Sequence, residues 1–174
     1  PGTFWPTNGS IGDVLVRLSQ AFRERESGES DLGVYRLNLA IVQALIQRRD
    51  VPIEPAREQE LGVDLDQNGK LGVARRVKFV PEPEARRMSY VGKARLEQAS
   101  GKLALAVGLF PLGTEFLHSV RYLEPTAEGV ALAPRLKELR YARKSEWFSY
   151  KMLDKRAQVE AIEKTDSPAE RRAL

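Results

Sequence analysis

The sequence predicts an α+β fold with N-terminal helices, an antiparallel sheet of about four strands, and a long C-terminal helix. Three observations predict it. Apolar residues recur at helical spacing near the N-terminus, four stretches rich in Val, Leu, Tyr and Phe follow, and a run without Gly or internal Pro closes the chain. With 174 residues and 42% hydrophobic content, residues 1–174 are expected to form a single domain with its own core.

Two helices are expected before residue 50. Residues 10–26 predict the first, because their apolar side chains recur every three or four positions: Ile11, Val14, Leu15, Leu18 and Phe22. A second stripe predicts a helix from about residue 37: Leu37, Ala40, Ile41, Ala44 and Leu45. The stretch VYRLN, where that helix starts, fits an extended conformation equally well. Residues 50–62 contain Pro and are expected to be a connection.

The middle of the chain predicts β-structure. Four candidate strands are separated by the turn signals PEPE, QASG and PLG, which suggests an antiparallel meander: 69–80, 86–97, 102–110 and 115–124. A basic helix is then expected over about 134–164, followed by a loose tail at 165–174. Residues 1–134 hold 17 basic and 17 acidic side chains, and residues 135–174 hold 11 and 7. The net charge of +4 therefore lies in the C-terminal segment.

Several function classes are excluded by composition. The chain has no cysteine, so it has no disulfide, thiolate metal site or cysteine nucleophile. The longest apolar run, residues 103–112, is about half the length of a spanning helix, so the chain is not expected to span a membrane. No phosphate loop, HExxH or GxSxG pattern occurs. A non-enzymatic protein is therefore favoured.

The segment DLDQNG, residues 64–69, points most directly to a ligand. Calcium prefers oxygen ligands, and alternate residues of a curled loop direct their side chains to one centre. Residues 64–71 resemble the calcium loops of EF-hand proteins, with Gly69 at the sharp sixth position. The resemblance implies a calcium site whose ligands are Asp64, Asp66, Asn68 and the carbonyl of Lys70.

The resemblance ends before the twelfth position, where Arg75 stands in place of the usual Glu. A carboxylate from elsewhere would have to replace it, and the candidates are Glu58, Glu60, Glu82 and Glu84. Such a site would be weak, in the ~10⁻⁴–10⁻³ M class of extracellular modules. It would fill only where calcium is abundant, which predicts a periplasmic or extracellular location.

A simpler interpretation of the same segment needs no ion. Asn68 and Gly69 lie between alternating apolar residues, which is typical of a two-residue β-hairpin turn. Aspartates also commonly cap their own turns. The sequence leaves the bare turn and the calcium loop open.

The single histidine offers an alternative function. Strand alternation places His118 on one face with Phe116, Val120 and Tyr122. A buried, hydrogen-bonded structural histidine is the favoured interpretation. The alternative is a hydrolase-like or metal-assisted enzyme centred on His118, which would need a nucleophile or carboxylates from distant segments.

The basic C-terminal segment interleaves cations with aromatic residues. Such residues dominate protein-binding hot spots, so a protein partner is expected to bind at Arg143, Trp147, Phe148, Tyr150 and Lys151. Nucleic acid is a less favoured partner, because acidic residues dilute the basic face. A third interpretation is that the aromatic rings pack on the sheet as part of the core. The sequence thus predicts a non-enzymatic, calcium-stabilised binding or accessory module outside the cytoplasm, as a subunit of a larger assembly.

Overall fold

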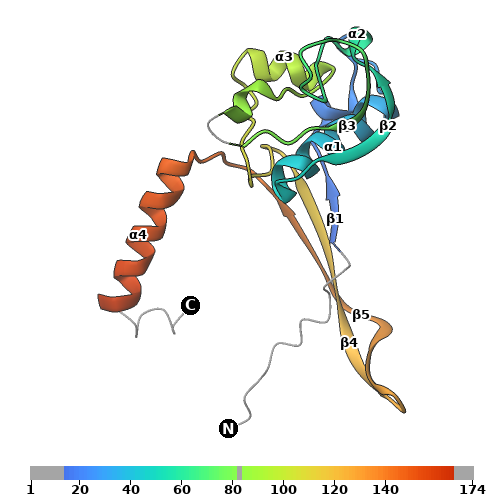
Figure 1. The fold of residues 1–174 in the computed structure, drawn as a ribbon. Coiled ribbons are helices and arrows are strands. Elements are labelled where there is room, and N and C mark those ends of the chain that lie inside the picture. The colour runs from blue at the N-terminus through green and yellow to red at the C-terminus, as the bar shows by residue number, and fades with distance from the viewer. Residues whose placement is uncertain (1–13, 82–83, 167–174) are drawn as a thin grey trace.

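The computed structural model describes residues 14–81 and 84–166. It confirms the α+β class, with five strands in two antiparallel sheets and a C-terminal helix (Figure 1). One sheet has the order β1-β4-β5, and the other pairs β2 with β3. The elements in chain order are β1 (Val14–Arg17), η1 (Gln20–Arg23), α1 (Leu32–Gln47), β2 (Val51–Arg57), α2 (Glu58–Leu61), β3 (Val73–Val77), η2 (Glu84–Arg87), α3 (Lys93–Ala99), β4 (Glu115–Thr126), β5 (Gly129–Arg143) and α4 (Tyr150–Asp166).

Helix α1 is the central element of the core. It confirms the predicted second helix but begins five residues earlier, because the Asp31 carboxylate caps it by accepting the Val34 N–H at 2.9 Å. Its buried face includes Ile41 and Leu45 and packs on η1 and β2. The helix ends where Arg48 adopts a left-handed conformation with φ 54°.

The fully buried side chain of Asn38 links three segments of this core. Its amide nitrogen donates to the carbonyls of Phe22 and Val91 at 3.0 and 3.1 Å. Its amide oxygen accepts the Val91 N–H at 2.9 Å. The rings of Phe22 and Tyr90 meet edge to face beside it, with centroids 4.8 Å apart. All polar groups of Asn38 are thereby satisfied inside the core.

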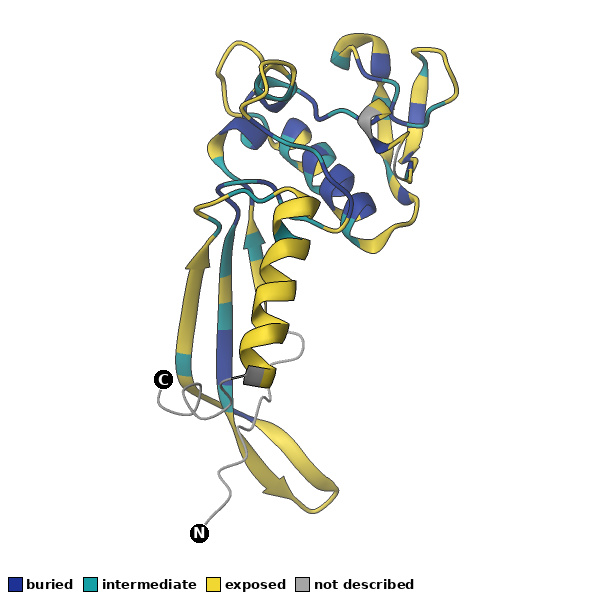
Figure 2. Cartoon of the chain, turned by 90° about the vertical axis from the view of Figure 1, so that its left-hand side faces the viewer, coloured by how far each residue is buried: buried dark blue, intermediate teal, exposed yellow. Residues whose placement is uncertain are grey.

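Strands β4 and β5 form a long ribbon that projects from this body (Figure 1). Strand β1 joins the ribbon only at its base, where Val14 lies opposite His118 and Arg17 lies opposite Glu115. The distal part of the ribbon and almost all of α4 are exposed (Figure 2). Helix α4 is tied back to the body by the Tyr150 hydroxyl, which donates to the Val107 carbonyl at 2.6 Å.

Three predicted elements are wrong. Residues 14–17 of the expected first helix form strand β1, because they pair with β4; residues 10–13 lie outside the described residues. The expected strand at 86–97 instead contains part of η2 and most of α3. Residues 102–110 form an irregular segment, whose apolar positions serve as buried anchors rather than as a strand: Leu103, Ala106 and Val107.

Other elements exist with different limits. Residues 134–143 belong to β5, so the C-terminal helix begins at Tyr150 rather than Pro134. The expected connection at 50–62 contains β2 and α2. Strands β3 and β4 confirm two of the predicted strands, but they lie in different sheets. Most of the predicted tail, 167–174, lies outside the described residues.

Candidate functional site

The DLDQNG segment forms a tight loop between α2 and β3. Gln67 and Gly69 adopt positive φ values of 55° and 84°. A type I′ hairpin turn needs positive φ at both of its central residues, which here would be Asn68 and Gly69. Among the described residues, Gly69 has a positive φ but Asn68 does not. The two-residue hairpin is therefore not formed. An EF-hand is not formed either, because the short α2 precedes the loop and a strand follows it.

The carboxylates of the loop accept its own backbone N–H groups. Asp64 accepts the N–H of Asn68 at 3.1 Å and that of Gly69 at 2.8 Å. Asp66 also accepts the Asn68 N–H, at 3.2 Å. The Asn68 amide oxygen accepts the Lys70 N–H at 2.8 Å. These bonds hold the predicted ligands in one curled loop without using all their lone pairs.

Two apolar side chains anchor the loop to the core. Val63 and Leu65 are buried on either side of Asp64. The Gln67 side chain closes the base of the loop by donating to the Asp64 carbonyl at 2.6 Å. Alternation between buried and outward positions thus directs the acidic residues away from the core.

Glu58 supplies a third carboxylate from outside the loop. It is the first residue of α2 and is fully buried. One of its oxygens accepts the N–H groups of Leu65 at 2.6 Å and Asp66 at 3.3 Å, and the other accepts that of Gly72 at 2.8 Å. Oxygen atoms of Glu58, Asp64 and Asp66 all lie within 4.8 Å of one another.

This arrangement selects one of the four candidate carboxylates. Glu60 and Glu84 lie on the surface in ion pairs with neighbouring arginines. Glu82 lies outside the described residues. Glu58 alone among the candidates that the structure describes reaches the loop.

Three carboxylates this close repel one another unless they are compensated. Among the side chains that the structure describes, which do not include that of Arg86, no ion pair joins any of them to a lysine or arginine. The backbone N–H groups compensate part of the charge. The remaining donor set consists only of oxygen atoms, which suits a hard divalent cation such as calcium.

His118 lies in β4, the central strand of its sheet. It is half-buried rather than buried as predicted. The residues directly opposite it are Val14 and Arg140, and neither is a nucleophile or a carboxylate. Its neighbours across the sheet are therefore an apolar residue and a basic residue.

The predicted partner-binding residues lie where β5 leads into α4. The Lys144 ammonium lies 4.4 Å from the centroid of the Trp147 ring and donates to the Phe110 carbonyl at 2.7 Å. Burial lowers the pKa of Lys144. The Arg156 guanidinium lies 3.7 Å from the Phe148 ring centroid. These cation–π contacts fix both rings on the surface of the chain.

The aromatic residues of this segment differ in exposure. Trp147 and Phe148 are half-buried, whereas Tyr150 is 46% exposed. Arg143 and Lys151 are exposed at its two ends. The rings are therefore neither free of the chain nor buried against the sheet.

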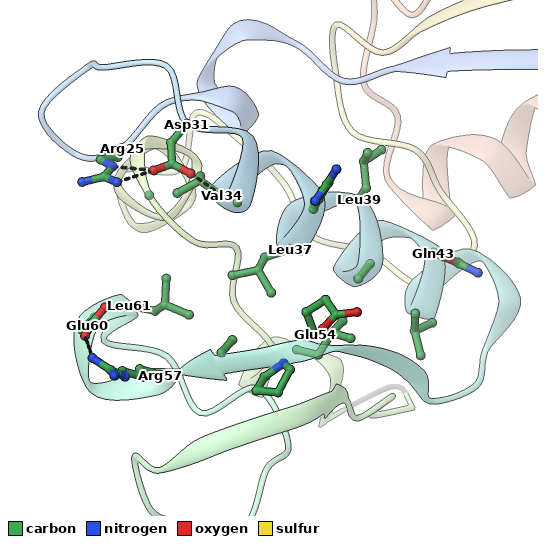
Figure 3. A pocket seen from close by; sticks show the side chains of 18 of the residues that line it. Arg25, Asp31, Val34, Leu37, Leu39, Gln43, Glu54, Arg57, Glu60 and Leu61 are labelled. Carbon is green, nitrogen blue, oxygen red and sulfur yellow. Dashed lines mark hydrogen bonds and ion pairs between the residues drawn. The ribbon is translucent and has the colours of Figure 1, made fainter.

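Sequence reasoning missed a groove of about 820 Å³ between α1 and β2 (Figure 3). The whole of β2 lines it, together with Val34, Leu37, Ala40 and Gln43 of α1. Ion pairs of Arg25 with Asp31 and of Arg57 with Glu60 flank one end. The helical spacing of the α1 residues could have indicated one wall of the groove. The other wall, β2, was not predicted, because residues 50–62 were expected to be a connection.

Comparisons with known proteins identify the family. A model of a lipoprotein family matches residues 1–170. An uncharacterized lipoprotein of Aquifex aeolicus is 30% identical over 144 residues, which cover 83% of this chain and 20% of the relative. The chain thus spans about a fifth of that curated relative. No solved structure matches the chain. Within the described residues, no helix is both long and apolar enough to cross a membrane. Because the family match extends over nearly the whole sequence, the chain belongs to this lipoprotein family.

Proposed function

We propose that the chain is a calcium-stabilised accessory module of the cell envelope, with the ion held by the loop at residues 64–70 and by Glu58. One observation carries the proposal. Glu58, a buried carboxylate from another element, lies within 4.8 Å of Asp64 and Asp66 in a loop that lacks its twelfth-position carboxylate. Asn68 and the Lys70 carbonyl would complete the oxygen ligands.

Bound calcium would compensate charges that the backbone N–H groups leave uncompensated. It would also tie α2 to the loop, since Glu58 belongs to α2 and Asp64 and Asp66 belong to the loop. The site is therefore structural, and its residues bind and orient rather than catalyse. The absence of HExxH, GxSxG and phosphate-loop patterns from the sequence supports a non-enzymatic role.

Membership of a lipoprotein family supports a location at the envelope, on its periplasmic or extracellular side. A site of the ~10⁻⁴–10⁻³ M class fills in such a compartment. The chain matches a fifth of a longer lipoprotein, which supports a role as one part of a larger assembly. Protein partners would meet it through the segment 143–151.

Thermal unfolding with calcium and with chelator tests the proposal. At tenfold saturation, calcium should stabilise the chain by about 1.4 kcal/mol, a shift in Tm of roughly 3–6 °C for a chain of this size. Asp64→Asn and Asp66→Asn should abolish the shift. Glu60→Gln is the matched control, because Glu60 is an exposed carboxylate that does not reach the loop, and it should keep the full shift.

An unchanged Tm of the wild-type chain in millimolar calcium and in chelator would reject the site. Magnesium serves as the control for non-specific screening. It demands a smaller, more regular shell of ligands than calcium, so an equal shift with magnesium would show that the loop merely responds to positive charge.

A further inference from the structure

One face of the β4–β5 ribbon carries a row of apolar side chains along β5, opposite Leu117, Ser119, Arg121, Leu123 and Pro125 of β4. Residues directly opposite in an antiparallel pair share a face. Leu117 lies opposite Tyr141, Leu123 opposite Leu132, and Pro125 opposite Val130. We name the apolar stripe by six residues of this face: Leu123, Val130, Leu132, Leu136, Leu139 and Tyr141.

The apolar stripe is open to solvent along its length. Its six side chains are between 42% and 71% exposed. On the other face, β5 carries the small or charged residues Ala131, Glu138, Arg140 and Ala142, whereas β4 adds Phe116 and Val120 there. Because the ribbon projects from the body, the core covers neither face of its distal part (Figures 1 and 2). A contiguous exposed apolar surface of this kind marks an interaction site.

The charges beside the apolar stripe are mainly basic. Residues 14–17 and 115–144 hold seven basic side chains and four acidic ones. Residues 145–174 hold six basic and six acidic side chains, so the basic excess of residues 135–174 lies within residues 135–144. Tyr141, at the base of the stripe, has an exposed ring, while its hydroxyl donates to Glu115 at 2.8 Å. An apolar ring with a polar end suits the boundary between water and lipid.

We infer that the apolar stripe binds the surface of an anionic membrane. The ribbon lies along the surface with the stripe at the boundary of headgroups and acyl chains, and its basic side chains meet the anionic headgroups. The lipoprotein family places a bilayer within reach of such a face. A second copy of the chain would instead bring two basic ribbons together, so the charge favours anionic lipid as the occupant.

Co-sedimentation of the full chain with vesicles tests the inference. Residues 1–174 contain no cysteine, so this assay measures their binding without an acylated cysteine. Vesicles of mixed phosphatidylglycerol and phosphatidylcholine should bind the wild-type chain, and vesicles of phosphatidylcholine alone should bind it more weakly. The double variant Leu132→Glu/Leu139→Glu should lose at least about tenfold in affinity for the anionic vesicles.

The matched control is Ala131→Glu/Ala142→Glu, which adds the same charges to the same strand on the opposite face. The affinity of this control for the anionic vesicles should stay within about threefold of that of the wild type, because only its net charge has changed. Leu132→Ser/Leu139→Ser adds no charge and should also weaken binding. This variant replaces the Glu variant in the test if circular dichroism shows that the Glu variant is misfolded.

Several outcomes would overturn the inference. They are no binding of the wild type to the anionic vesicles, equal losses in the stripe and control variants, or equal binding to both vesicle types. A dimer in buffer that Leu132→Ser/Leu139→Ser converts to monomer would identify a second copy as the occupant instead.

Discussion

Replacing Glu58 with Gln separates its structural role from its role as a ligand. The Gln amide nitrogen cannot accept an N–H, so at least one of the three backbone bonds to Glu58 is lost. A hydrogen bond to a charged group contributes about 1.5–3 kcal/mol. Without calcium, the variant also gains stability, because two unit charges 4.8 Å apart repel by about 1–3.5 kcal/mol at effective dielectric constants of 80 to 20.

These opposing effects nearly cancel in chelator, where Glu58→Gln should change the free energy of unfolding by no more than about 1 kcal/mol. In calcium, the ion already compensates the repulsion, so the variant loses both the backbone bond and the ligand. Its destabilisation should then exceed that in chelator by up to about 1.4 kcal/mol at tenfold saturation of the wild type, which is the whole stabilisation that calcium gives the wild type.

Urea unfolding followed by circular dichroism measures both differences from four curves, wild type and variant, each in calcium and in chelator. Glu60→Gln, measured in the same way, should show no dependence on calcium. An equal effect of Glu58→Gln in the two solutions would refute the ligand role and leave Glu58 as a cap for the backbone of the loop.

Three further predictions concern the fold and the partner segment. Asn38→Leu leaves three backbone groups without partners in the core and should lower the free energy of unfolding by about 3 kcal/mol or more, by urea titration; a loss below 1 kcal/mol would contradict the linking role of Asn38. The bond from Arg17 lowers the pKa of Glu115 to about 2. Since this folded pKa lies below the unfolded value, the stabilisation is present above about pH 4.3 and disappears toward pH 2. Wild type and Glu115→Gln should therefore differ in Tm at pH 7 and converge at pH 2, whereas a constant gap would argue against ionisation as the cause. Trp147→Ala removes the ring beside Lys144 and should cost about 0.5–1 kcal/mol of stability, but it should weaken binding of a protein partner by about 2 kcal/mol or more, with modest salt dependence in a binding titration.

The sequence places the proposed loop ligands in one segment but does not show which distant carboxylate lies beside them. Asp64, Asp66 and Asn68 lie in one local segment, where spacing alone predicts proximity. Glu58 reaches them only because α2 turns the chain back, so that its side chain accepts the N–H of Gly72, fourteen positions later. Four glutamates were equivalent candidates in the sequence, and tertiary structure distinguishes them.

The misassigned start of the C-terminal helix has a specific physical cause. On β5, Leu132, Leu136 and Leu139 share a face although they are four and three residues apart. Irregularities in the pairing insert extra residues into β5 opposite Val120 to Leu123. Residues four apart share a face of any regular strand, and the extra residue between Leu136 and Glu138 also brings Leu139 to that face. The resulting spacings of four and three match the pattern of an amphipathic helix. Only pairing with β4 distinguishes the two.

The unequal lengths of the sheet's strands should produce a gradient of amide hydrogen exchange along the ribbon. Near Phe116, β4 lies between two neighbouring strands, but beyond His118 the described pairing is with β5 alone. An isolated two-stranded hairpin is marginally stable in water, so opening should become easier toward Thr126 and exchange there should be faster. Bound lipid would cover one face of this end and slow its exchange most. Slower amide exchange near Thr126 would therefore indicate that lipid is bound to the ribbon.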